Sequence, residues 1–111
     1  MDIRIKTIED IYVIEISGRM DTFNSRNIEP KLDGILEEFK PKVVIDLSEV
    51  DYISSVGLRV LLSALKKQIK NQGTLGVASL QPFVREVFTV TQFDKIFQIY
   101  STQEEAIKST I

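Results

Sequence analysis

Two adjacent serines, Ser54 and Ser55, are the side chains whose type and position in this sequence point to a functional site. A serine acts as a catalytic nucleophile when a nearby base, usually histidine, activates its hydroxyl. The chain has no histidine and no cysteine. A Ser-His-Asp triad, a cysteine nucleophile, thiolate metal ligands and histidine zinc sites are therefore excluded.

The two serines lie between a strand pattern and a helix pattern. Residues 43–47 form a short apolar segment rich in β-branched side chains, which is typical of a buried strand. A strand that leads into a helix through a tight turn leaves that turn at the carboxyl end of the sheet, where α/β proteins place functional groups. A helix is predicted from near Ser55 to residues 71–73, because apolar side chains recur at helical spacing: Leu58, Leu61, Leu62, Leu65 and Ile69.

Helix capping is a simpler explanation for the same serine pair. The first turn of any helix has unpaired backbone N–H groups, and serine is a preferred residue for accepting their hydrogen bonds. Position alone does not separate a capping role from a functional one, so both stay open for Ser54 and Ser55.

The residues around the serines resemble a known family. Residues 51–62, DYISSVGLRVLL, preceded by residues 44–48, VIDLS, are similar to the signature segment of STAS-domain proteins, and among them of the bacterial anti-sigma-factor antagonists. The resemblance spans essentially the whole chain, because the N-terminal hairpin, residues 18–21 and residues 93–97 also match the family pattern.

In that family the segment usually reads Asp-Ser-Ser/Thr/Ala-Gly-Leu, and a partner kinase phosphorylates its first serine. Aligned through Gly57, that serine is Ser55. Ser54 stands where many members have Asp, Val56 where they have Ser, Thr or Ala, and Arg59 replaces a common Gly. Because Ser54 is also a hydroxyl, it is the alternative phosphorylation site.

The resemblance implies a partner switch. The unphosphorylated protein would bind an anti-sigma factor that is also its serine kinase and thereby release a sigma factor, phosphorylation would break the complex, and a protein phosphatase would reverse it. An alternative is a STAS module that is never phosphorylated and acts as a scaffold or binds a small ligand or nucleotide. The residues expected to contact the partner are Asp21, Ser54, Ser55, Val56, Gly57 and Arg59.

Three of these residues have a second interpretation. Asp21 is either a loop-capping carboxylate or, by the resemblance, part of an acidic rim beside the phosphorylation site. Arg59, one helical turn after Ser55, either pairs with the phosphate or is a solvated side chain. Gly57 is either demanded by crowding of the backbone or merely tolerated in the first turn.

Composition narrows the classes of function further. The chain has 111 residues, 43% of them hydrophobic, which suits one domain spanning residues 1–111. Its net charge of −2 disfavours nucleic acid as a partner and favours proteins. No apolar run is long enough to cross a bilayer, so we expect a cytoplasmic protein without membrane insertion. We expect no enzymatic activity, no cofactor and no metal.

The predicted order of elements is ββαβαβαβα, an α/β fold of the STAS type. Strands are expected at residues 3–8, 11–16, 43–47 and 74–78, with a last short strand ending near Tyr100. The first strand should be an antiparallel edge of a mostly parallel sheet. The helices should lie largely on one face, since right-handed crossovers in an advancing strand order return on the same side.

The remaining expectations concern the ends of elements. Gly18 should interrupt the second strand and begin a loop over residues 18–22. Gly73 should adopt a left-handed helix terminus, and Asp46, in an apolar strand, should be hydrogen-bonded. One helix is expected after a cap at Asn24 or Ser25, and its apolar face comprises Ile28, Leu32, Ile35, Leu36 and Phe39. Another is expected from Pro82, with apolar residues Phe83, Val84, Val87 and Phe88. A terminal helix should run from the Thr102 capping box to about Lys108.

Overall fold

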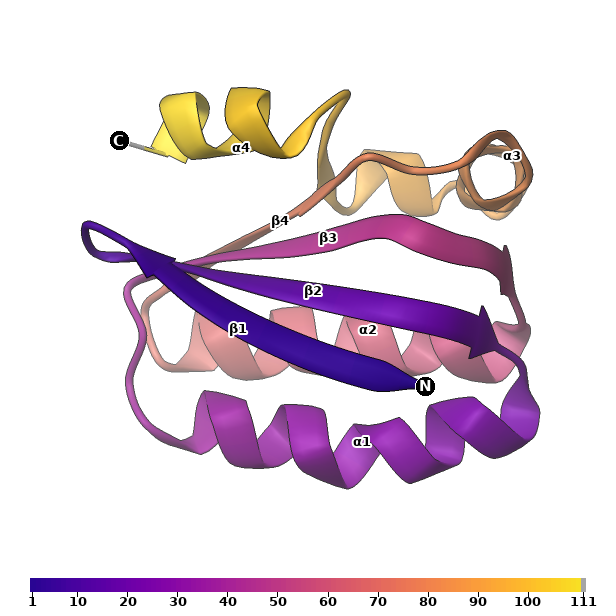
Figure 1. The fold of residues 1–111 in the computed structure, drawn as a ribbon, viewed down its shortest axis with the longest axis horizontal. Helices are drawn as coiled ribbons and strands as arrows, with labels where there is room; N and C mark the ends of the chain where they lie inside the picture. The colour runs from indigo at the N-terminus through magenta and orange to yellow at the C-terminus, as the bar shows by residue number, and fades with distance from the viewer. Residues whose placement is uncertain (111) are drawn as a thin grey trace.

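The computed structural model describes residues 1–110, which fold around one five-stranded sheet of order β1-β2-β3-β4-β5 (Figure 1). The strands are β1 (Asp2–Ile8), β2 (Ile11–Met20), β3 (Lys42–Ile53), β4 (Thr74–Ala78) and β5 (Gln98–Tyr100). β1 pairs with β2 antiparallel, and the other neighbours are parallel. The predicted ββαβαβαβα order and the antiparallel edge strand are confirmed.

The helices are α1 (Thr22–Glu37), α2 (Ser55–Lys70), α3 (Pro82–Val90) and α4 (Gln103–Thr110), with a short 3₁₀ helix η1 (Phe93–Lys95) before β5. The buried side chains of α1, α2 and α3 join one core cluster. Helices α1 and α2 lie together on one face of the sheet, whereas α3 packs at the far end of β3 and is drawn above that strand in Figure 1. The expectation that the helices lie largely on one face therefore holds for α1 and α2. The terminal helix α4 lies on the face of the sheet opposite α1 and α2 (Figure 1). Its Ala106 packs in a smaller cluster with strand residues.

Strand alternation divides β3 between these two clusters. Val43, Ile45 and Leu47 face the larger core, whereas Val44 and Asp46 face α4. Asp46 is 5% exposed, and its Oδ1 accepts a hydrogen bond of 2.8 Å from the Ser48 N–H. The prediction of a hydrogen-bonded Asp46 is therefore confirmed, although it lies inside β3 and not at the end of the strand.

Both strands that lead to the serines are longer than predicted. β2 continues through Gly18 to Met20, and β3 continues to Ile53, because the two strands keep pairing beyond their first apolar segments. Gly18 has φ +121°, and the register shifts between Glu15 and Ser17 and between Gly18 and Met20. The loop predicted over residues 18–22 was wrong, since glycine here accommodates an irregularity inside the strand.

Helix α1 begins earlier and ends earlier than its apolar pattern suggested. Its N-cap is Asp21, whose Oδ1 accepts a 2.8 Å hydrogen bond from the Asn24 N–H, so the predicted cap at Asn24 or Ser25 was wrong. Pro30 lies inside the helix. Phe39 lies beyond its end and is 64% exposed, so it does not belong to the apolar face.

Glycine is needed at position 73, after the end of α2, for a different reason from the one predicted. The left-handed residue is Gln72, with φ 65°, and Gly73 is required for another reason. A Cβ at Gly73 would lie 2.7 Å from the Lys40 carbonyl oxygen and would also collide with the Gln68 side chain. The Thr102 cap is confirmed, because its Oγ1 accepts a 3.0 Å hydrogen bond from the Glu105 N–H.

Candidate functional site

The carboxyl ends of β2 and β3 bring the two predicted site segments together. Met20 and Ile53 are partners in the last register position of this strand pair. The Ser54 N–H donates a 2.9 Å hydrogen bond to the Met20 carbonyl, which fixes the start of α2 beside the start of α1. Asp21 and the serine pair therefore lie at one edge of the sheet, which we call the carboxyl edge (residues 20–21 and 53–55).

The two serines differ in what their hydroxyls do. Ser54 is half-buried and caps α2, since its Oγ accepts a 3.1 Å hydrogen bond from the Gly57 N–H. Ser55 is the first residue of α2 and is exposed. Among residues 1–110, the Ser55 hydroxyl takes no part in the side-chain hydrogen bonds. The capping interpretation thus accounts for Ser54 and leaves Ser55 for another role.

Gly57 is fixed by space at the point where α2 meets the sheet. A Cβ at this position would lie 2.8 Å from Ile53 Cγ1, 3.1 Å from the Met20 carbonyl oxygen and 3.2 Å from Met20 Cβ. Its φ is not positive, so crowding and not backbone conformation demands glycine. The absence of a side chain lets α2 approach the ends of both strands and sets the position of Ser55.

Two depressions flank the exposed face of α2 near Ser55. One is an apolar groove of about 550 Å³, and the other is a polar depression of about 340 Å³. Arg59 lines both of them, whereas Val56 lines only the second. The groove is lined by Ser55, Leu58, Arg59, Leu62, Thr91 and Phe93, and the polar depression by Arg26, Glu29, Val56, Arg59, Val60 and Ser63.

Asp21 combines its capping role with an ion pair. Its Oδ2 lies 3.8 Å from Arg19 Nε, and the Arg19 guanidinium lies 3.8 Å from the centre of the Tyr52 ring. Tyr52 in turn stacks on Phe83 of α3, with ring centres 5.6 Å apart. Capping is therefore confirmed for Asp21, and the cation and aromatic rings form a connected surface beside it.

Sequence reasoning missed Arg19, Tyr52 and Phe83, and also the contribution of Thr91 and Phe93 to the groove. The last two follow α3 and are far from Ser55 in sequence, so no local spacing joins them to the serines. Aromatic residues near the ends of elements were the available signal, and Phe83 was predicted only as part of the apolar side of its helix.

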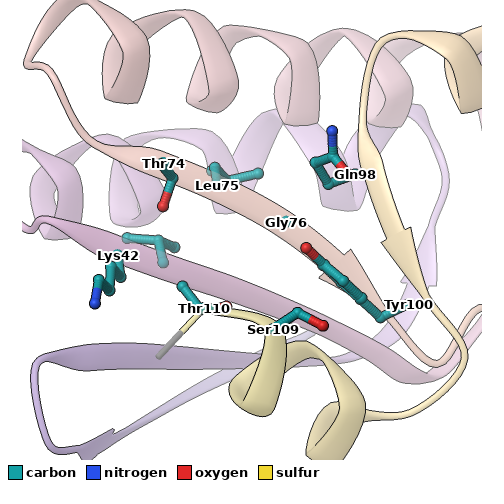
Figure 2. A pocket seen from close by; sticks show the side chains of 9 residues that line it. Lys42, Thr74, Leu75, Gly76, Gln98, Tyr100, Ser109 and Thr110 are labelled. Carbon is teal, nitrogen blue, oxygen red and sulfur yellow. The ribbon is translucent and has the colours of Figure 1, made fainter.

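A separate pocket of about 230 Å³ lies between the sheet and α4 (Figure 2). Most of its residues come from the amino ends of β3 and β4, from β5 and from the end of α4, and none belongs to the carboxyl edge. Within residues 1–110, no group of three or more acidic, histidine or cysteine side chains is arranged to hold a metal ion. No helix of this part of the chain is long and apolar enough to span a membrane.

Comparison with known proteins shows the family of this chain. The STAS domain family model matches residues 2–106. The chain is 34% identical to BtrV of Bordetella bronchiseptica, a candidate anti-sigma factor antagonist, over 106 residues that cover 96% of this chain and 91% of that protein. It is 28% identical to the anti-sigma-F factor antagonist RsfB of Mycobacterium tuberculosis, with coverage of 87% and 79%.

A solved structure has the same fold. The crystal structure of an anti-sigma factor antagonist from Mycobacterium paratuberculosis superposes with a TM-score of 0.89 at 28% identity, covering 98% of this chain and 92% of that one. The chain therefore belongs to the STAS domain family. Its predicted resemblance to the anti-sigma-factor antagonists within that family is confirmed by these relatives.

Proposed function

We propose that this chain is an anti-sigma-factor antagonist controlled by phosphorylation of Ser55. When unphosphorylated it binds an anti-sigma factor that is also a serine kinase, and a sigma factor is released. The single observation that carries the proposal is the exposed Ser55 hydroxyl beside a cap already filled by Ser54. The protein acts by binding and not by turnover, as a single domain in the cytoplasm, and a phosphatase resets it.

The predicted partner residues divide into two groups in this proposal. Ser54, Gly57 and Asp21 are positioning residues, because they cap helices or allow α2 to approach the sheet. Ser55, Val56 and Arg59 present the contact surface, with the apolar groove beside them. An anti-sigma factor would contact the Ser55 hydroxyl, the apolar groove and Arg59 in one interface.

Phosphorylation changes this surface with little effect on the fold. The γ-phosphoryl group of ATP is transferred to Ser55 Oγ, ADP leaves, and the hydroxyl proton passes to a base of the kinase. The product carries about 1.5 to 2 additional negative charges at neutral pH. An exposed residue accommodates them in water, whereas a complex formed around a neutral hydroxyl has to desolvate them, so the complex dissociates.

Calorimetric titration against the candidate anti-sigma factor kinase of the same host tests this function. We expect Ser55→Ala to retain binding and Ser55→Asp to weaken it by at least about tenfold, because aspartate introduces a charge that the interface has to desolvate. Ser109→Asp is the matched control, since it adds the same charge at an exposed position near the end of α4. Equal affinities of Ser55→Asp and the unaltered protein would contradict the proposal.

The alternative is a STAS module that is not phosphorylated and binds a small ligand. The pocket under α4 is the observation in its favour, because Tyr100, Gln98 and Thr74 line a cavity large enough for a small molecule (Figure 2). Saturable binding of a small molecule, together with an absence of phosphate after incubation with host kinases, would favour this alternative.

A further inference from the structure

Arg59 lies where it can reach a group attached to Ser55. The two residues are four positions apart in α2, and side chains at this spacing are neighbours on a helix surface. Both are exposed, and both line the apolar groove. Because helical side chains tilt toward the amino end, an arginine at this spacing can reach Ser55 without a change in the helix backbone.

The environment of Arg59 leaves its charge available. It takes part in none of the ion pairs found among residues 1–110. The charged groups beside it are Arg26 and Glu29 of α1, which line the polar depression with it. Their charges are opposite, so neither sign dominates that side of Arg59.

The first turn of α2 offers Arg59 no charged partner. Arg59 is the fifth residue of α2, just past the first turn, and that turn holds no acidic residue. A dianion at Ser55 would place the opposite charge one turn before the arginine, and a negative charge at the amino end of a helix is itself favourable.

We propose that Arg59 receives the phosphate of phosphorylated Ser55 and holds it in an intrahelical ion pair across the mouth of the apolar groove. This inference rests on the proposed function for the origin of the phosphate. Before modification the guanidinium is available to a carboxylate of the partner. After modification it is bound to the phosphate and withdrawn from the polar depression, so one covalent change alters both depressions that flank α2.

A phosphorus NMR titration tests the ion pair without any kinase. Phosphoserine is incorporated at position 55 during synthesis, and the pH midpoint of the second phosphate ionisation is measured. Because a guanidinium stabilises the dianion, Arg59→Gln should raise this midpoint by about half a pH unit relative to the unaltered phosphoprotein. Arg59→Lys should raise the midpoint less than Arg59→Gln does, because lysine keeps the positive charge. High salt should reduce the difference in midpoint between the unaltered phosphoprotein and Arg59→Gln.

Lys66→Gln is the matched control, because it removes the same charge from an exposed residue of the same helix, two turns further along. Its midpoint should equal that of the unaltered phosphoprotein. Equal midpoints for Arg59→Gln and Lys66→Gln would overturn the ion pair. The result is independent of the proposed function. If the midpoint of the unaltered phosphoprotein is lower than that of Arg59→Gln but no kinase modifies Ser55, the ion pair stands and the proposed phosphorylation switch fails.

Discussion

The carboxyl edge and the face under α4 use their polar residues in opposite ways. Under α4, Gln103 Nε2 donates hydrogen bonds to Asp46 Oδ2 at 2.7 Å and to Glu15 Oε2 at 2.9 Å. These groups satisfy one another and attach the helix to the sheet. At the carboxyl edge, the Ser54 hydroxyl accepts the Gly57 N–H, whereas Ser55, and Arg59 one turn further along α2, are exposed. Polar groups paired internally build the fold, and those left exposed beside them are available to partners.

The largest expected effect on stability is at Gly57, where α2 approaches the ends of β2 and β3 too closely for a side chain. Gly57→Val should destabilise the protein by about 3 kcal/mol, because its side chain would overlap Ile53 and the Met20 backbone. Urea denaturation measures the change. At Gly34, where an added Cβ would meet no other part of the fold within 4 Å, the same substitution should change stability by less than about 0.5 kcal/mol. Equal effects at both glycines would show that crowding does not fix α2.

The next largest effect on stability is expected at Asp46, whose carboxylate accepts a hydrogen bond from Gln103 of α4. Asp46→Ala should cost about 2 kcal/mol, because the Ser48 N–H and Gln103 lose a buried acceptor, and amide exchange in α4 should accelerate. Phosphorylation of Ser55 should not change. Glu104→Ala, which removes an exposed carboxylate of the same helix, should cost less than about 0.5 kcal/mol. A loss of phosphorylation in the folded Asp46 variant would break the separation between the two regions.

The smallest effects separate the adjacent serines. Ser54→Ala should destabilise the protein by about 1 kcal/mol through loss of the cap, whereas Ser55→Ala should stay within about 0.5 kcal/mol of the unaltered protein. Thermal or urea unfolding of the two variants provides the comparison. A larger loss in the Ser55 variant would mean that the capping role belongs to Ser55.

Much of the fold could be predicted because local patterns and tertiary packing agree. Apolar periodicity located α2, Pro82 marked the start of α3, and the Thr102 box marked α4. The ends of β2 and β3 could not be predicted in the same way. Ser48 and Glu49 are exposed polar residues, yet the strand continues through them, because Glu49 pairs with Ser17 of β2 after an irregularity that includes Ser48.

The candidate site was predicted at the level of segments and not of side-chain roles. Two neighbouring serines have the same capping propensity, so only the hydrogen bond from the Gly57 N–H distinguishes Ser54 from Ser55. Asp21 was recognised as a possible cap, but the start of α1 was placed later because Asn24 and Ser25 are equally suitable by type. The apolar groove could not be predicted, because Phe93 is far from Ser55 in sequence and lines the groove with it only in the folded chain.

The division of roles between Ser54 and Ser55 is tested most directly by intact mass and peptide mapping. The unaltered protein, Ser54→Ala and Ser55→Ala are incubated with ATP and the candidate serine kinase of the same host. We expect a single phosphate on Ser55 in the unaltered protein and in Ser54→Ala, and none in Ser55→Ala. A phosphate on Ser54, or one retained in Ser55→Ala, would contradict the assignment of Ser55 as the switch.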